Sequence, residues 1–436
     1  MKKYLFNLIW MLADRLLMLV FQLYIFVSIK RLYDLETLGG WSTINNLSQL
    51  LMSLFMLGID VVVVKRIVES KERAGVEIGS AITIQFFGAI AYSLFFWLII
   101  KAFYQDIAHV NTYFIVFVIA NFFSIFSKTI FWHYSALVES KFRAITIMLS
   151  MVFGFGFSFF ANLQWPELIF FSFAFYYFVQ FLVAVVIYFF CFDKRVLWSY
   201  DKAITKSYLI VGAKLIISTL SVAIFVQVDS LMLEKFSGVK EVGVFNAALK
   251  ISTIWFFMAG VIASAFFPKI IQLKSRKSDC LFLLQWMITL VIYLTLFASI
   301  FITFFGGDIL QILYGEPMVA SAKVLSIHIW SSLFVFMGAF SSKWLYANDE
   351  INLDIYKTVV AAVFNVALNL LVIPAYGAVG ASVVSLASYF IANFLFFLFI
   401  RRVRSIFVLQ CKALLAVFNP LGVIRDYRKI KCLFQS

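Results

Sequence analysis

The sequence predicts an all-α membrane protein that crosses the bilayer many times, and its composition, run lengths and charge placement all indicate this. Hydrophobic residues make up 64% of the 436 residues and charged residues 13%, with a mean hydropathy of +0.98. Globular proteins have ~45–50% and ~25% of these classes, so this chain cannot cover itself with a polar surface in water. A net charge of +14 could suggest nucleic acid, but the charges lie between long apolar runs, which favours an anionic membrane surface.

The apolar runs have the length of spanning helices. Each is about 20 residues long, enough to cross ~30 Å of hydrocarbon as an α-helix. None alternates apolar with polar residues as a strand of a transmembrane barrel does. We therefore expect twelve transmembrane helices. Their ranges are 4–29, 41–64, 79–102, 111–135, 144–163, 168–192, 208–233, 241–267, 281–305, 323–346, 355–374 and 377–400.

These spans predict two halves and a tail. We expect an N-terminal six-helix bundle over 1–192, a polar and basic cytoplasmic linker over 193–207, and a C-terminal six-helix bundle over 208–400. A basic cytoplasmic or interfacial tail follows at 401–436. Its apolar stretch at 405–418 is too short to span, because spanning takes about 20 residues. We expect an interfacial helix there, with a re-entrant or additional paired span as the alternative.

The first span carries Asp14 and Arg15 inside its apolar run. The Met-Lys-Lys start resembles a secretory signal, but the two charges interrupt the apolar region and no small-residue cleavage site follows. We expect a retained helix.

The Lys and Arg residues predict the orientation. With the N-terminus in the cytoplasm, 25 of the 36 basic residues fall on the cytoplasmic side, 6 on the opposite side and 5 inside spans. Cytoplasmic loops carry the excess of basic residues, so both termini are expected in the cytoplasm. The cysteines fall on that side, where disulfides are rare, and their spacings match no metal motif. They are Cys191, Cys280, Cys411 and Cys432.

A faint internal repeat relates the halves. The segment LGGW at 38–41 opens the second span, and VGVF at 242–245 opens the eighth, 204 residues later. The same offset relates Lys65 to Lys269 at the cytoplasmic exits of these spans. Six spans separate the copies, so the repeat is parallel and predicts two bundles around an axis along the membrane normal.

Charged and polar residues inside the spans are the candidate functional residues. A charge at the bilayer centre costs at least ~2.5–3.5 kcal/mol, so such residues usually face a cavity or a partner. The cations expected to line a cavity and bind substrate are Arg15, Lys128, Lys214 and Lys250. The residues expected to couple an ion or line the cavity are Asp14, Asp60, Asp229, Asn246, Asn365 and Asn369.

Each candidate also has a structural interpretation. Arg15 and Asn246 could join helices as hydrogen-bonded pairs, and Lys128 and Lys214 could reach a membrane surface along their long side chains. The acids could be caps or interfacial charges, and the two asparagines near 365 could bond helix to helix.

The excess of deep cations predicts an anionic substrate, since Arg and Lys are the side chains that bind phosphate. The sequence contains no GxxxxGK[ST], GxSxG, HExxH or CxxC motif. It therefore predicts no enzyme, no cofactor and no metal centre.

Three further segments resemble a known family. VQVDSLML at 226–233, VGVFNAA at 242–248 followed by Pro268, and IPAYGAVGA at 373–381 resemble the Wzx-type O-antigen flippases. These belong to the multidrug/oligosaccharidyl-lipid/polysaccharide exporter superfamily, whose fold is MATE-like. With the segment at 38–41, the resemblance covers nearly the whole chain.

The resemblance implies a V-shaped pair of bundles around a central cationic cavity in a bacterial inner membrane. It implies that an undecaprenyl-pyrophosphate-linked repeat unit of O-antigen, for lipopolysaccharide biosynthesis, moves from the cytoplasmic to the periplasmic leaflet by alternating access. A polysaccharide polymerase and a chain-length regulator are candidate partners. Proton or sodium counter-transport, or consumption of the product, would give the direction.

Two alternatives stay open. A cation-coupled multidrug antiporter of the same fold should show acids in its cavity. A membrane O-antigen polymerase or glycosyltransferase should show a long polar periplasmic loop, whereas the longest such loop here lies around 306–322.

Overall fold

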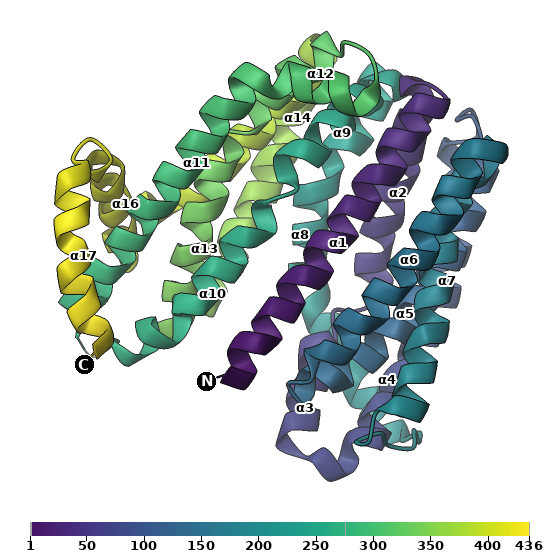
Figure 1. The fold of residues 1–436 in the computed structure, drawn as a ribbon, viewed down its shortest axis with the longest axis horizontal. Helices are drawn as coiled ribbons and strands as arrows, with labels where there is room; N and C mark the ends of the chain where they lie inside the picture. Colours follow the sequence, from purple (N-terminus) through teal and green to yellow (C-terminus); the bar gives the residue numbers. More distant parts are fainter. Residues whose placement is uncertain (1, 275, 436) are drawn as a thin grey trace. The chain divides into compact units, whose positions relative to one another are not determined.

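The computed structural model describes the backbone of residues 2–274 and 276–435, and every regular element in these ranges is a helix (Figure 1). It leaves undescribed the side chains of residues 1–9, 11–14, 214, 217, 218, 268, 428 and 431–435. The chain divides into two compact units, Met1–Gln227 and Val228–Ser436. The division falls inside the long helix α8, C-terminal to the linker that the sequence predicts. The all-α class is confirmed for the described residues.

The first unit contains seven long helices, the start of an eighth and short connecting turns. The bounds are α1 Lys2–Leu32, α2 Leu35–Phe55, α3 Asp60–Glu69, η1 Lys71–Arg73, α4 Ala74–Phe103, α5 Val110–Ala136, α6 Ser140–Gln164, η2 Pro166–Ile169, α7 Phe171–Val186, η3 Ile187–Cys191 and α8 Lys202–Ser237.

Helix α2 begins where Asp34 caps it. The Thr37 backbone N–H donates to Asp34 Oδ1 at 2.7 Å, which satisfies one of the free donors of the first turn. The same hydrogen bond stabilises the carboxylate and lowers the pKa of Asp34 below its ordinary value.

The LGGW segment anchors the core of the first unit. The Trp41 ring is buried and packs against aromatic rings of α5 and of the α7 region, at centroid distances of 5.5 Å to Tyr113 and 4.6 Å to Phe117. Aromatic pairs in such tilted and edge-on geometries contribute ~0.5–1.5 kcal/mol beyond their buried area. This packing explains why an indole follows two glycines at the start of α2.

The linker packs tightly on α4. A Cβ at Gly75 would collide with the Leu197 carbonyl, and one at Gly79 with the Ser199 backbone. The Ser199 N–H donates to the Gly75 carbonyl at 3.1 Å, and the Asp201 N–H donates to Ser80 Oγ at 3.1 Å. Glycine at these two positions lets the linker backbone lie directly against the helix.

The second unit begins with the end of α8 and continues through nine α-helices. The bounds are α9 Val239–Thr253, α10 Phe256–Gln272, α11 Lys277–Tyr314, α12 Val319–His328, α13 Ser331–Ala347, α14 Ile351–Phe390, η4 Ile391–Leu395, α15 Phe396–Phe399, α16 Arg404–Ala416 and α17 Pro420–Gln435. Helices α2 and α9 begin 204 residues apart, and each is followed by a break and a second helix.

Helix α14 is two helices joined at a kink. Gly377 has φ 52° and ψ −135°, outside helical geometry, and Pro374 precedes it. Glu241 Oε2 accepts the Ala378 N–H at 2.9 Å, which satisfies a donor that the kink frees. The apolar stretch Ile351–Phe399 has 49 residues, or ~74 Å at ~1.5 Å per residue, more than twice the ~30 Å of hydrocarbon. It has the length of the two predicted spans 355–374 and 377–400.

Among the described residues, eight helices are long and apolar enough to cross a membrane, or up to ten if each of two bent pairs is one span. The bent pairs are α2 with α3 and α16 with α17. Exposed aromatic side chains on α4 and α11 fit contact with lipid tails; they are Phe86, Phe87, Phe95, Trp97, Phe297, Phe301, Phe304 and Phe305. A multi-pass membrane protein is therefore confirmed, and twelve spans remain a prediction.

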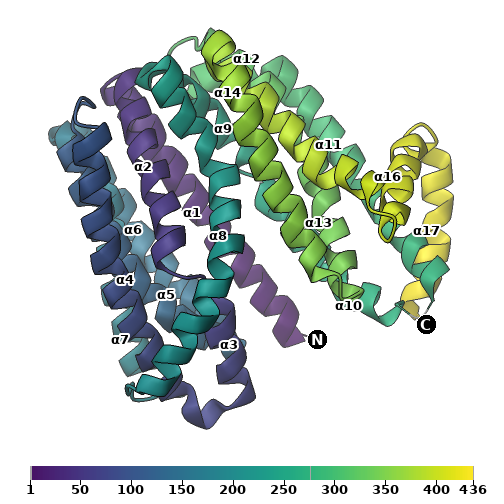
Figure 2. The same ribbon diagram turned by 180° about the vertical axis from the view of Figure 1, so that it is seen from behind.

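The tail forms a hairpin along α11 (Figure 2). Tyr293 OH donates to the Val417 carbonyl at 2.8 Å, next to the turn of the hairpin. Trp286 Nε1 donates to the Val423 carbonyl at 3.0 Å on the returning helix. Helices α16 and α17 both pack on α11 and are bent by 113° relative to each other. Whether this tail is interfacial, re-entrant or a paired span stays a prediction.

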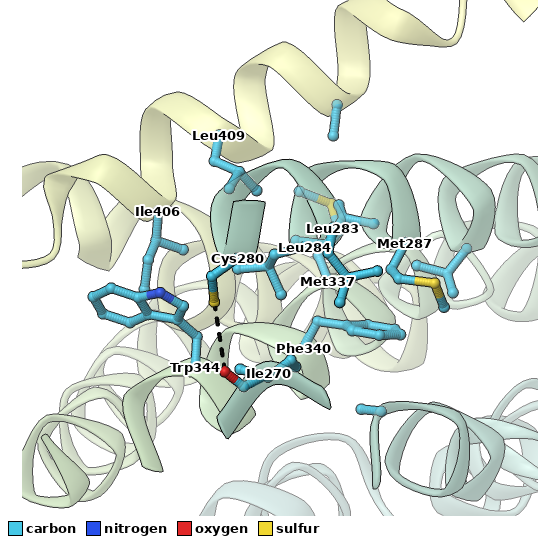
Figure 3. Packing of buried hydrophobic residues seen from close by; sticks show 14 of the residues in the cluster. Ile270, Cys280, Leu283, Leu284, Met287, Met337, Phe340, Trp344, Ile406 and Leu409 are labelled. Carbon is cyan, nitrogen blue, oxygen red and sulfur yellow. Dashed lines mark hydrogen bonds between the residues drawn. The ribbon is translucent and has the colours of Figure 1, made fainter. Parts of the chain in front are cut away.

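The core of the second unit includes this hairpin. Figure 3 shows Ile406 and Leu409 of α16 lying over α11, where Leu283 and Leu284 are fully buried. Cys280 is only 4% exposed, and its thiol donates to the Ile270 carbonyl at 3.8 Å. Because Cys280 is buried, a thiol reagent would fail to react with it on either side of the membrane. Cys280 therefore cannot be used to test the orientation.

Cys191, which is exposed at the end of η3, can test the predicted orientation. In a protein whose other cysteines are serine, a membrane-impermeant thiol reagent should leave Cys191 unlabelled in intact cells and label it after permeabilisation. Lys240→Cys, at an exposed position on the opposite predicted side, should react before permeabilisation. Labelling of Cys191 in intact cells would contradict the predicted orientation and place this end of the helix outside the cytoplasm.

Candidate functional site

A buried polar cluster around Asp229 is the best-defined candidate site. Asp229 lies on the last part of α8, and its partners lie on both halves of α14. Asn369 Nδ2 donates to Asp229 Oδ1 at 2.5 Å and is 3.1 Å from Asn365 Oδ1. Ser385 Oγ, beyond the Gly377 kink, donates to Asp229 Oδ2. The kink lets α14 contribute partners from two directions.

The cluster is closed to solvent and acidic. Asp229 is 4% exposed, Asn365 and Asn369 are 0% exposed and Ser385 is 3% exposed. Among the described residues, Asp229 forms no ion pair with a basic side chain. A buried carboxylate without a counter-charge is costly. Such a group is stable when it holds a proton or a bound cation.

The oxygen atoms of this cluster fit a small cation. Asn369 Oδ1 is buried and lacks a hydrogen-bond partner among the described residues, as does Asn365 Nδ2. Carboxylate, amide and hydroxyl oxygens are the ligands that hard cations prefer. The cluster therefore contains the types of oxygen atom that bind hard cations.

Neighbouring polar residues form hydrogen bonds between helices. Asn246 Nδ2 on α9 donates to Ser230 Oγ on α8 at 2.9 Å and to the Val242 carbonyl at 3.1 Å. This bond joins two helices, which was one of the interpretations of Asn246. Ser252 Oγ, also on α9, lies 2.8 Å from Nδ1 of His328 on α12.

The first unit brings together two other candidates. Asp60, at the start of α3, and Lys128 on α5 are both exposed, and they interact electrostatically with each other. Arg143 on α6 also acts on Lys128. Two cations and one acid from three helices therefore lie near one another. Sequence spacing could not reveal Arg143, because it lies close to a helix end where basic residues are common.

Two further candidate cations, Arg15 and Lys250, have described side chains. Arg15 is exposed on α1, and its charge acts on Tyr177 of α7. Lys250 is half-buried on α9. The side chains of Asp14 and Lys214 lie outside the described residues.

A further polar cluster in the first unit was not predicted from the sequence; it consists of Arg66, Glu77 and Tyr208. Tyr208 OH donates to Glu77 Oε2 at 2.5 Å, and Arg66 lies 4.5 Å over the Tyr208 ring. Arg66 Nη1 also donates to Ser207 Oγ at 2.8 Å and lies 3.7 Å from Glu77 Oε2. These contacts tie α3 and α4 to the start of α8. No group of His, Cys, Asp and Glu in the described ranges could hold a metal ion.

Two buried serines on the second half of α14 test the Asp229 cluster. Ser385 donates to the carboxylate, whereas Ser382 donates to the Val379 carbonyl of its own helix. At a pH at which Asp229 is ionised, Ser385→Ala should lower stability by ~1.5–3 kcal/mol, as for a bond to a charged group, and Ser382→Ala by ~0.5–1.5 kcal/mol. The measurement is the Tm of the purified protein in detergent.

The control is Asp229→Asn, which removes the charge and keeps the size. In that background the Ser385→Ala effect should shrink toward that of Ser382→Ala. Equal Tm changes for the two serine variants in the wild-type background would show that Ser385 does not stabilise a carboxylate.

Comparison with known proteins places the chain in a family. Residues 1–274 match the family described as "Polysaccharide biosynthesis protein". The chain is 25% identical over 179 residues to the capsular polysaccharide biosynthesis protein CapF of Staphylococcus aureus, covering 40% of this chain and 45% of that one. It is 25% identical over 150 residues to the probable low-salt glycan biosynthesis flippase Agl15 of Haloferax volcanii, covering 34% and 32%. These matches span less than half the length of either relative.

The fold is also similar to solved structures. Against the lipid II flippase MurJ in an inward closed conformation, the TM-score is 0.73 at 13% identity, covering 95% of this chain and 92% of that one. This similarity shows the fold alone. Since the family match spans more than half of the sequence, the chain belongs to the polysaccharide biosynthesis protein family.

Proposed function

We propose that this protein is a flippase for a lipid-linked oligosaccharide, a transporter rather than an enzyme. The family match over residues 1–274 carries this proposal. The relatives named for capsular polysaccharide and glycan biosynthesis, and the MurJ-like fold, support it. The substrate is an undecaprenyl-pyrophosphate-linked repeat unit, of O-antigen type, that moves from the cytoplasmic to the periplasmic leaflet of a bacterial inner membrane.

The accessible cations are the proposed headgroup ligands. Arg15 and Lys128 are exposed side chains on apolar helices of the first unit. A diphosphate loses its hydration when it enters the membrane, and Arg and Lys replace that water by charge-assisted hydrogen bonds. Arg binds two phosphate oxygens at once, whereas Lys acts as a point charge. Lys214 and Lys250 are proposed to contribute from the later spans.

The Asp229 cluster is the proposed coupling site. Binding or release of a proton or sodium ion changes the charge of a buried carboxylate, and hydrogen bonds from both halves of α14 must then rearrange. Asp60, beside Lys128, is a second candidate. A change in the charge of Asp229 therefore alters hydrogen bonds to both halves of α14, on either side of Gly377. Such a change could favour one state of an alternating-access cycle.

The finer architecture is part of the proposal. Twelve spans in two parallel-repeat bundles, with both termini cytoplasmic, are supported by the 25-to-6 basic bias and by α2 and α9, which begin 204 residues apart. A polysaccharide polymerase and a chain-length regulator would use the product in the periplasm.

Arg15 tests the headgroup role. In cells that depend on this protein, Arg15→Lys should keep part of the surface polysaccharide, because it keeps the charge. Arg15→Ala should lose most of it, and Arg15→Glu should be worst, since it repels the diphosphate. Lys65→Ala removes an exposed cation that pairs with Glu69 at 3.7 Å, and it should have little effect.

The readout is surface polysaccharide together with the amount of protein in the membrane. Loss of protein in Arg15→Ala would indicate a structural role instead. Full polysaccharide in Arg15→Ala, with abundant protein, would contradict the headgroup role.

A further inference from the structure

A basic cavity lies at one end of the second unit, and none of the candidate residues discussed above lines it. It has a volume of about 240 Å³, and three turns meet there: α10–α11, α13–α14 and α15–α16. By the basic-residue bias this end faces the cytoplasm. Its lining residues are Lys274, Lys277, Cys280, Trp344, Asn348, Glu350, Arg402 and Val403.

Cations dominate the lining. Lys274, Lys277 and Arg402 face one carboxylate, that of Glu350. Arg402 Nη1 lies 4.0 Å from Glu350 Oε1, at the limit of an ion pair, and Lys274 Nζ lies 2.7 Å from Asp349 Oδ2 outside the lining. Lys277 has no acidic partner among the described residues. The cavity therefore keeps a net positive charge after its internal pairs are counted.

The start of α11 adds to this field. Lys277 is the first residue of a helix of 38 residues, and Arg276 at its N-cap position makes no side-chain hydrogen bond to the first turn. Asp279 in that turn offsets part of the charge of the helix end. The free N–H groups and the dipole of a helix N-terminus favour an anion. The lysine, the arginine and the helix end thus contribute charge of one sign at the same cavity.

Part of the lining is apolar. Trp344 is 7% exposed and Val403 1% exposed, and both belong to the buried core that also contains Cys280 and Ile406. Figure 3 shows the Trp344 ring beside Ile406 and close to Cys280. A cavity lined by both basic and apolar side chains, next to the tail that packs on α11, suits an anionic group attached to an apolar body.

We propose that this cavity binds a phosphate-bearing anion, with Lys277 and Arg402 as its principal ligands. Two sources share that chemistry, the headgroup of an anionic phospholipid and free inorganic phosphate. In either case the ligand bridges the start of α11 and the base of the α16–α17 hairpin, and so holds the tail on the second unit. This proposal does not depend on the identity of the transported substrate.

The test is a binding measurement on the purified full chain in neutral detergent at constant ionic strength. The probes are dioctanoyl-phosphatidylglycerol, dioctanoyl-phosphatidylcholine and sodium phosphate. Phosphatidylglycerol should bind more tightly than phosphatidylcholine. Phosphate that binds as tightly as phosphatidylglycerol would assign the site to the free anion, and much weaker phosphate binding would assign it to the lipid headgroup.

Variants assign the binding to this cavity. Lys277→Gln with Arg402→Gln should weaken the binding by ~10-fold or more, as expected for two lost charge-assisted bonds. Glu350→Gln removes the competing carboxylate and should tighten it, so the proposal can be tested even if the double variant folds poorly. Lys412→Gln with Arg425→Gln removes the same charge at exposed hairpin positions outside the cavity, and the affinity should stay as in wild type.

Three results would overturn the proposal. The first is that neither phosphatidylglycerol nor phosphate binds. The second is equal affinity for phosphatidylglycerol and phosphatidylcholine. The third is an unchanged affinity in both the double variant and Glu350→Gln.

Discussion

Hydrocarbon does not hydrogen-bond, and most of this structure follows from that constraint. A backbone in lipid must satisfy its polar groups internally, so the apolar runs form helices. Where a helix breaks, another group replaces the lost partner, as Glu241 does at the Gly377 kink. The same constraint acts on side chains, because a buried acid without donors would be unstable. The Asp229 cluster meets it with Asn369 and Ser385.

The contacts of the linker indicate where the chain between the two units can bend. Because its backbone lies against Gly75 and Gly79 and bonds to α4, the polar segment before α8 is part of the first unit. The sequence predicts a linker between the two bundles over 193–207. The contacts fix the first part of that segment, so any pivot between the units is expected farther along α8, after the residues that bond to the first unit.

Helical periodicity explains which parts could be predicted. Asn365 and Asn369 are one turn apart, so they had to share a face, and their hydrogen bond to another helix follows. The all-α class follows from run length. Ser385 could not be found, because an isolated serine in an apolar run gives no signal and its partner lies 156 residues away. The basic cavity could not be predicted either. In the sequence Lys277 and Arg402 look like ordinary basic residues that flank spanning helices, and only the fold brings the turns that carry them together.

The proposed function, movement of a lipid-linked oligosaccharide across the bilayer, can be measured directly. The direct measurement uses proteoliposomes that contain undecaprenyl-pyrophosphate-linked oligosaccharide from the cells that express the protein, with its sugar carrying a fluorophore. A membrane-impermeant quencher reports the outer-leaflet fraction. With wild-type protein, the initially protected inner-leaflet pool should become accessible over time, and Asp229→Asn should slow this. Protection that persists as in protein-free liposomes, with folded protein present under imposed proton and sodium gradients, would contradict the claim.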